Sequence, residues 1–364
     1  MKPLRILLSV HTVAAWGGLQ DWAVGMVKGL VANGAEVHMV ANNQRIVEEC
    51  QGFARHSFLI DWGSWQNSVK EILATCEFDV VFTQPFAARE LALELRRRTG
   101  VPIVYMSHGN NSDFAYGWRH EIAKFLVASS SLIPMLRDFC GVTDTPIEVL
   151  PNGVPDSLFD IPTVGYQARI DQGSYDFVLA ARLMPDKLSQ VDGLIAVASS
   201  LLRSGRIPKA TVHLMGGGPS KEEFLARLGA FVREDPRAEL HYHGWVSQTQ
   251  VVDQLRSAVF SVAGGVTGAQ SMAVGTPCLG AGIRGICGVS TPANMDRVLG
   301  SNFGDHSARL HMTPAEIERD CQWILEPENF KAFQECYVPL MRHERTHSAI
   351  AALALRQISD AVSP

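Results

Sequence analysis

Two cations, Arg182 and Lys187, follow an apolar run that ends at Ala181. This spacing places them where a strand ends and a helix begins, so both charges and the first N–H groups of the helix can converge on one point. Guanidinium and ammonium groups bind phosphate oxygens through strong, charge-assisted hydrogen bonds. The residues therefore predict a site for the diphosphate of a sugar nucleotide.

Glycine-rich segments follow at the ends of two later apolar runs. Gly216 and Gly217 lie after one run, and Gly264, Gly265 and Gly268 lie after the other. Because glycine has no Cβ, the backbone at such positions can approach a ligand closely. We expect the glycine segments to lie beside the same ligand as the two cations.

The composition indicates a folded protein of two domains. The chain has 364 residues, of which 46% are hydrophobic and 19% are charged, and this length suits two cores of common size. The formal net charge is -5, so nothing in the composition favours nucleic acid, which binds to a basic surface. We therefore expect a two-domain enzyme, and the composition gives no evidence for a nucleic-acid partner.

The compartment is also suggested by the sequence. The seven cysteines are scattered, odd in number and without a C-x-x-C pair, which indicates a reducing compartment and no structural zinc. No window approaches about 20 apolar residues, the length needed to span a bilayer. We expect a cytoplasmic protein with at most peripheral membrane contact, through Trp62 and Trp65.

The order of the elements predicts the fold class. Short apolar runs alternate with helical patterns, which is typical of a parallel sheet covered by helices on both faces. The chain is loose and rich in proline and glycine between 151 and 173, as expected of a linker. The prediction is an α/β protein with two doubly wound, Rossmann-like domains, over 1–160 and 161–340, and a C-terminal helix over 341–364.

Six short motifs occur in a characteristic order along the chain. They are Trp16-Gly17-Gly18, Leu150-Pro151-Asn152-Gly153-Val154, Arg182-Leu183 with Lys187, Gly216-Gly217-Gly218-Pro219, His243-Gly244-Trp245-Val246 and Gly275-Thr276-Pro277. In this order they resemble the GT-B glycosyltransferases of the retaining family 4, over nearly the whole length. The resemblance implies two Rossmann-like domains facing a central cleft, an acceptor on the first domain and a nucleotide-sugar donor on the second.

The resemblance gives roles to individual residues. Arg182 and Lys187 would stabilise the leaving diphosphate, since fixed cations can do so without a metal, and the sequence has no D-x-D. Family members carry two glutamates eight residues apart, at positions held here by Val262 and Gln270. The carboxamide of Gln270 can still accept bonds from ribose hydroxyls, whereas Val262 accepts none. The donor-binding residues are Gly17, Gly18, Gly216, Gly217, Gly265 and Gln270.

The first domain is expected to bind the acceptor. Five of the seven tryptophans lie within the first 118 residues, which favours a glycan-like or aromatic acceptor. Trp16, Asp21 and Asn110 are the predicted acceptor contacts. His108 follows the strand over 102–106 and, by the resemblance, lies near the transferring sugar, where it would bond a hydroxyl or accept the acceptor's proton. The alternative for His108 is a histidine that only caps a turn.

Two further motifs are set aside. His343-Glu344-Arg345-Thr346-His347 matches H-E-x-x-H, but the 17 residues that follow contain no Glu, His or Cys, so a third ligand must come from elsewhere. Gly280-Ala281-Gly282-Ile283-Arg284-Gly285 matches G-x-G-x-x-G, but it follows a late strand rather than opening a first βαβ unit. This loop is instead expected to offer backbone N–H groups to donor phosphate or sugar.

These observations favour a metal-independent retaining glycosyltransferase of EC 2.4 type without a cofactor. The donor would be a nucleotide-diphosphate sugar, and the acceptor a hydroxyl of a glycan, a lipid-linked molecule or a small molecule. Two other functions stay open. One is a non-catalytic GT-B protein that binds a glycan or nucleotide sugar, favoured by the absence of the glutamates. The other is a GT-B sugar-nucleotide epimerase.

Overall fold

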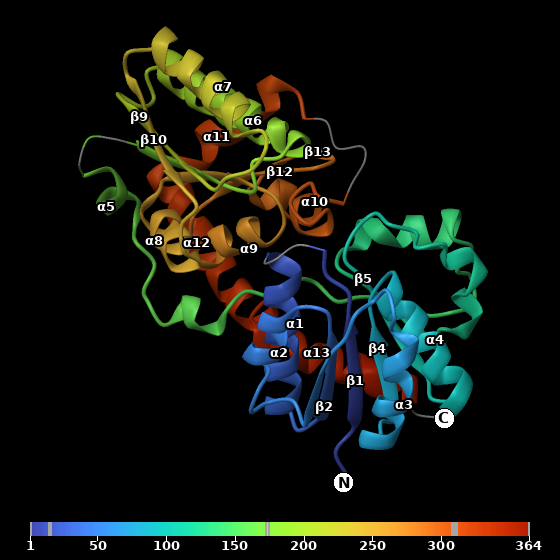
Figure 1. Ribbon diagram of the computed structural model, residues 1–364. Helices are drawn as coiled ribbons and strands as arrows, with labels where there is room; N and C mark the ends of the chain where they lie inside the picture. The colour runs from blue at the N-terminus through green and yellow to red at the C-terminus, as the bar shows by residue number, and fades with distance from the viewer. Residues whose placement is uncertain (1, 14–16, 172, 174, 307–311, 363–364) are drawn as a thin grey trace. The chain divides into compact units, whose positions relative to one another are not determined.

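The computed structural model describes residues 2–13, 17–171, 173, 175–306 and 312–362. Contacts divide the chain into two compact units (Figure 1). Unit 1 comprises Met1–Pro155 and Thr346–Pro364, and unit 2 comprises Asp156–Arg345. The chain therefore leaves unit 1 once and returns to it at the C-terminus.

The described part of unit 1 is built on a seven-stranded parallel sheet with the order β3-β2-β1-β4-β5-β6-β7. Its strands are β1 (Arg5–Val10), β2 (Glu36–Ala41), β3 (His56–Leu59), β4 (Val80–Thr83), β5 (Ile103–Ser107), β6 (Lys124–Val127) and β7 (Ile147–Val149). The central strands are apolar along their length because helices cover both faces. All carboxyl ends of these parallel strands consequently lie at one edge.

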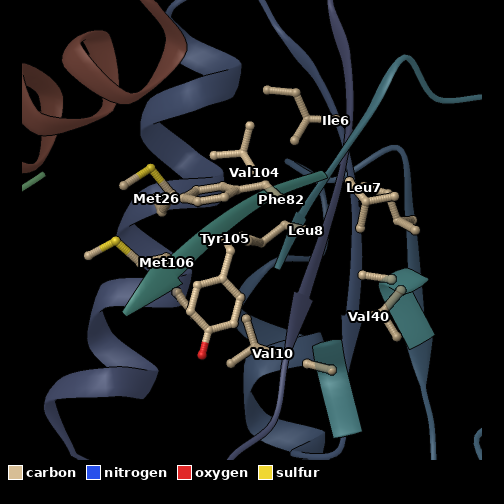
Figure 2. Packing of buried hydrophobic residues seen from close by; sticks show 14 of the residues in the cluster. Ile6, Leu7, Leu8, Val10, Met26, Val40, Phe82, Val104, Tyr105 and Met106 are labelled. Carbon is tan, nitrogen blue, oxygen red and sulfur yellow. The ribbon is translucent and has the colours of Figure 1, made fainter. Parts of the chain in front are cut away.

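The core of unit 1 forms on both faces of this sheet. Ile6, Leu7 and Leu8 of β1 are fully buried, and Figure 2 shows them with residues of the neighbouring strands β4 and β5. Met26 of α1 belongs to the same cluster. Consecutive residues of β1 point to opposite faces, so their burial shows that both faces are covered. This packing fixes the edge at which β1, β4 and β5 end.

Helices α1 to α4 and α13 accompany this sheet. They are α1 (Gly18–Ala32), α2 (Gln44–Glu49), α3 (Gln66–Thr75), α4 (Ala87–Thr99) and α13 (His347–Val362). The C-terminal α13, red in Figure 1, packs along the blue α1. A Cβ added at Gly29 would collide with Ala351, so glycine permits the close approach of these two helices.

The described part of unit 2 contains a six-stranded sheet with the order β10-β9-β8-β11-β12-β13. Its strands are β8 (Tyr175–Ala180), β9 (Ala210–Met215), β10 (Ala238–Gly244), β11 (Phe260–Ala263), β12 (Cys278–Gly282) and β13 (Gly285–Val289). All neighbouring strands are parallel except β12 and β13, which form an antiparallel hairpin. Unit 2 thus repeats the doubly wound layout and ends it with a hairpin.

The helices of unit 2 alternate with these strands and then follow them. They are α5 (Tyr166–Ile170), α6 (Leu188–Arg203), α7 (Lys221–Glu234), α8 (Gln248–Ser257), α9 (Gly265–Ala273), α10 (Met295–Gly300), α11 (Pro314–Ile324) and α12 (Pro327–Glu344). None of the described helices has the length and apolar character needed to cross a bilayer. The predicted α/β class with two Rossmann-like domains is confirmed.

Neither of the two motifs set aside has the local structure that its function requires. The H-E-x-x-H stretch is interrupted, because α12 ends at Glu344 and α13 begins at His347. Its two histidines therefore do not share one face of a continuous helix. The G-x-G-x-x-G stretch forms the corner of the β12–β13 hairpin and is followed by a strand, whereas a dinucleotide fingerprint opens a helix.

Candidate functional site

Arg182 lies two residues after the end of β8, on a backbone that a glycine segment holds in place. The N–H of Leu183 donates to the carbonyl of Gly217 (3.0 Å), and the carbonyl of Leu183 accepts from the N–H of Ser220 (2.9 Å). The Arg182 side chain is exposed, and it has no hydrogen bond or ion pair with any residue that the structure describes. A fixed backbone therefore carries a guanidinium whose donors remain available to an anion.

The glycine segment after β9 packs against the backbone that carries Arg182. Gly216 and Gly218 have φ angles of 121° and 153°. A Cβ at Gly216 would collide with the carbonyl oxygen of Ala181, and a Cβ at Gly218 would lie 2.5 Å from that of Leu183. Glycine is thus required here to hold the two strand ends together. Donor binding by Gly216 and Gly217 stays a prediction.

Trp245 is a candidate site residue that was not among those predicted from the sequence. It follows β10, its side chain is 71% exposed, and a Cβ at Gly217 would lie 2.5 Å from its indole Nε1. The indole therefore lies directly on the backbone of Gly217. Exposed aromatic faces of this kind serve as stacking platforms for bases and sugars. The sequence already indicated this residue, because Trp245 belongs to the His243-Gly244-Trp245-Val246 motif.

Lys187 is paired with an acid that the sequence did not reveal. Its Nζ lies 2.7 Å from Oδ1 of Asp305, and the two side chains are 13% and 20% exposed. The same Oδ1 accepts the N–H of Ile283 at the corner of the β12–β13 hairpin (3.0 Å). That N–H, expected to serve a donor phosphate or sugar, is therefore engaged by Asp305 instead.

Asp305 is carried by a strained turn that follows α10. Asn302, Phe303 and Gly304 have φ angles of 50°, 56° and 84°. Left-handed conformations in non-glycine residues cost about 1–3 kcal/mol each, although asparagine tolerates them better than phenylalanine. Phe303 is nevertheless buried, with 2% exposure. The surrounding packing must stabilise this turn.

The glycines around the start of α9 make room for that turn. A Cβ at Gly265 would lie 2.7 Å from Oδ2 of Asp305, and a Cβ at Gly268 would collide with the ring of Phe303. A Cβ at Gly264 would lie 3.0 Å from Oδ1 of Asp305. We expected these glycines to admit a ligand, but the space beside them is filled by residues of the same chain.

The two positions that would hold glutamates are both buried. Val262 lies in β11 with 0% exposure, near the position that a Cβ of Gly193 in α6 would take. Gln270 lies in α9 with 4% exposure, and its Oε1 accepts from Nε2 of Gln248 (2.7 Å). The carboxamide oxygen proposed for ribose is thus already hydrogen-bonded to α8.

In unit 1, His108 lies at the end of β5 beside α1. Its Nε2 is 3.1 Å from Nε2 of Gln84, which follows β4, and the amide can donate to a neutral imidazole there. The His108 ring meets the Trp22 ring edge-on, with centroids 4.4 Å apart. His108 therefore contacts Gln84 after β4 and Trp22 of α1.

Several buried polar atoms near this edge of unit 1 lack a hydrogen-bond partner within the described chain. They are His11 Nδ1, Trp22 Nε1, Trp62 Nε1 and Gln84 Oε1. The His11 ring lies 5.7 Å from the Trp62 ring and 5.9 Å from the Phe86 ring, centroid to centroid, and burial lowers the pKa of His11. Burying an unpaired polar atom is costly, so such a group is a functional candidate.

The remaining predicted residues of unit 1 lie at the start of α1 and in the loop after β5. Gly17 precedes α1, Gly18 begins it, and Asp21 is in its first turn. Asn110 is half-buried in the loop after His108. The contact between Trp22 and His108 brings these two segments together. Trp16 lies outside the described residues.

An ion pair supports the loop after β5. Asp113 is 3% exposed and accepts from Nε of Arg89 (3.0 Å) and from the N–H of Phe86 (3.0 Å). Trp118 donates its Nε1 to the Asp113 carbonyl (2.8 Å) and packs beside Tyr105. Trp118 is thus a core residue, so the clustering of tryptophans in this part of the sequence is partly a packing effect.

Comparison with known sequences adds to this geometry. The Glycosyltransferase Family 4 profile matches residues 16–158, which cover most of the first segment of unit 1. The match to this family model thus covers residues 16–158 of the 364 in the chain. A D-inositol 3-phosphate glycosyltransferase of Frankia alni is 27% identical over 245 residues, which are 57% of this chain and 58% of that enzyme. The chain thus aligns with little more than half of that relative's length.

Solved structures resemble the whole chain. A glycosyltransferase of Rickettsia africae superposes with a TM-score of 0.72 at 12% identity, covering 100% of both chains. Anabaena Alr3699/HepE, solved in complex with UDP and glucose, superposes with a TM-score of 0.64 at 13% identity, covering 98% of this chain and 100% of the other. These likenesses show the GT-B fold, and with the family 4 match they confirm the predicted resemblance.

Proposed function

We propose that this protein transfers a sugar from a nucleotide-diphosphate donor to a hydroxyl acceptor, with retention of anomeric configuration and without a metal. The observation that carries the proposal is the exposed Arg182 guanidinium on a fixed backbone, at the same sheet edge as Lys187. As the bond between the anomeric carbon and the phosphate oxygen breaks, its electron pair passes to the diphosphate. Preorganised cations stabilise that developing charge.

Each unit would supply one half of the reaction. In unit 2, the exposed Trp245 offers its aromatic face to the nucleotide base, beside Gly217. In unit 1, the acceptor hydroxyl would form the new bond to the anomeric carbon and release its proton. We expect His108, beside Gln84, to bond a sugar hydroxyl or to accept that proton. To act as the base, it must release the Gln84 amide from its Nε2.

The relatives support the chemical class of the partners. The Frankia protein is named for a glycosyl transfer to an inositol phosphate, and the Anabaena protein was solved with UDP and glucose. A nucleotide-sugar donor and a polyhydroxyl acceptor are therefore the partners we propose here. No cofactor beyond the donor is part of this proposal.

Calorimetric titration with UDP-, GDP-, TDP- and ADP-sugars, each in EDTA and in magnesium, tests the proposal. We expect one donor to bind in EDTA, and to bind at least about tenfold more weakly to Arg182→Ala and Lys187→Ala, as expected for a lost charge-assisted contact. Arg233→Ala, an exposed arginine on α7, is the matched control. Binding unaffected by the two variants would contradict the donor site, and binding only in magnesium would contradict metal independence.

A non-catalytic binding protein is the second candidate, because Val262 is buried and the Gln270 oxygen is already bonded. Transfer of a radiolabelled sugar to any acceptor would rule it out. The anomeric configuration of the product, determined by NMR, tests retention, and conversion of the donor without an acceptor would instead indicate an epimerase.

A further inference from the structure

The ammonium of Lys187 is held by one carboxylate. Lysine carries its charge on a flexible four-carbon stem, so a defined position requires a partner. Oδ1 of Asp305 lies 2.7 Å from Nζ, and the N–H of Ile283 donates to the same oxygen at 3.0 Å. Asp305 is therefore anchored on the β12–β13 corner while it holds Lys187.

The carboxylate also lies at the first residue of α9. A Cβ at Gly265 would lie 2.7 Å from Oδ2 of Asp305, and the N–H of Gly265 donates to the carbonyl of Asn302 (3.1 Å). A helix N-terminus favours negative charge. An ammonium, a backbone N–H and a helix start therefore stabilise one acid. Arg182 is then the predicted donor-site cation without a counter-charge in the described chain.

The turn that carries Asp305 is fixed at several points despite its strain. Phe303 fits against Gly268, and the carbonyl of Gly304 accepts the N–H of Arg284 (3.0 Å). A Cβ at Gly282 would collide with the backbone of Gly304 and Asp305. Strained backbone persists only where the surroundings determine it, and it concentrates at functional sites. The structure thus maintains a strained turn whose last side chain reaches a predicted substrate-binding cation.

We infer that Asp305 is a positioning residue of the donor site and acts through Lys187. It holds the ammonium where charge develops on the leaving diphosphate, and it limits the net positive charge there. The proton stays on Lys187 throughout, and the Asp305 carboxylate forms no bond to the sugar. The inference rests on the proposed function for the identity of the anion, a nucleoside diphosphate, but not for the pairing itself.

Kinetics of Asp305→Asn with the donor identified by calorimetry test the catalytic part. We expect turnover to fall by about 10²-fold, the loss that a misplaced catalytic group produces, with the KM for the donor nearly unchanged. Affinity for UDP or GDP should be retained or increased, because both cations remain. Asp186→Asn, which removes an exposed acid beside Lys187, is the control and should behave as wild type.

Two further variants distinguish positioning from a merely structural role. In a Lys187→Ala background, Asp305→Asn should cause no additional loss of turnover, because the two residues act as one unit. Asp305→Glu should not restore activity, since the space beside Gly264, Gly265 and Gly282 does not admit another methylene. Equal losses of turnover in both backgrounds, or a loss of nucleotide binding together with a lower Tm, would overturn the inference.

Modification of Lys187 by an amine-acylating ester, followed by mass spectrometry, tests the pairing without any substrate. Asp305→Asn should raise the acylation rate at Lys187 several-fold, because the reagent attacks an uncharged, released amine, whereas Asp186→Asn should not. An unchanged rate would overturn the inference even if donor binds. Faster acylation in a protein that binds no nucleotide sugar would reject the proposed function and retain Asp305 as the partner that fixes Lys187.

Discussion

The carboxyl edges of the two sheets carry different kinds of chemical groups. In unit 1 the edge holds buried aromatic rings and uncharged polar atoms, four of which lack a partner within the described chain. In unit 2 the edge holds glycine backbone, the exposed Arg182 and the Lys187–Asp305 pair. Uncharged donors and acceptors suit hydroxyl groups, and fixed cations suit phosphate. One doubly wound layout thus presents two kinds of chemistry.

The largest expected effect follows from adding one methyl group to the glycine segment of unit 2. In Gly216→Ala the new Cβ would meet the Ala181 carbonyl oxygen at a φ of 121°, so we expect a loss of roughly 4 kcal/mol or more in the free energy of unfolding. Urea titration measures it. The control is Gly205→Ala, where φ is 71° but nothing lies within 4 Å, with an expected loss of about 1–2 kcal/mol from backbone strain.

Equal losses in the two glycine variants would show that packing between the strand ends does not fix the backbone of Arg182. The difference between the two sheet edges could then not be attributed to backbone contacts in unit 2. A larger loss at Gly216 supports the view that unit 2 positions its cation through backbone contacts.

The next effect concerns the Arg89–Asp113 ion pair of unit 1, which is buried within the protein and, unlike Arg182, does not reach solvent. Asp113→Asn removes the buried counter-charge of Arg89 and leaves it only the exposed carboxylate of Glu90. Breaking a buried pair costs about 3–5 kcal/mol, here at the lower end because Glu90 remains and the amide keeps a hydrogen-bond acceptor. Urea unfolding measures this change, and Asp186→Asn serves as the exposed control. A change of less than about 1 kcal/mol would show that this pair is not structural.

Much of the fold follows from the sequence, because buried parallel strands are apolar runs and helices end at glycine. Strands β3 and β13 depart from this pattern and were not predicted. β3 contains the polar residues His56 and Ser57, and β13 is interrupted by glycine at its first and fourth positions. The glycines near α9 were expected to admit a ligand, whereas residues of the same chain lie against them. The contact with Asp305 was not predictable, since Asp305 and Lys187 are 118 residues apart and two of the three left-handed residues before Asp305, Asn302 and Phe303, are not glycine.

A smaller effect on stability should accompany a larger effect on function at Gln84. Gln84→Met removes a buried oxygen that has no partner in the described chain, but it also removes the hydrogen bond to His108. Because these two effects oppose each other, the free energy of unfolding should change by no more than about 1 kcal/mol in either direction. Activity should fall, because the contact that orients His108 is lost. A destabilised variant with normal turnover would reverse the interpretation of this edge.

The smallest expected effect is a pH dependence from His11. Burial lowers its pKa below the usual 6.5, so the unfolded chain binds more protons and folding stability decreases as the pH falls below about 6.5. His11→Phe keeps the ring contacts to Trp62 and Phe86 but removes this titration. Urea unfolding at pH 7.5 and 5.5 should show a smaller decrease in the variant. An identical decrease would assign the effect to other buried histidines.

The return of the chain to unit 1 has a consequence for biosynthesis. The helix α13, which packs along α1, is translated after the whole of unit 2, Asp156–Arg345. Unit 1 therefore exposes the α1 surface that α13 covers until all of unit 2 has been synthesised. The unit that is begun first thus completes its fold only after translation has passed through the other one.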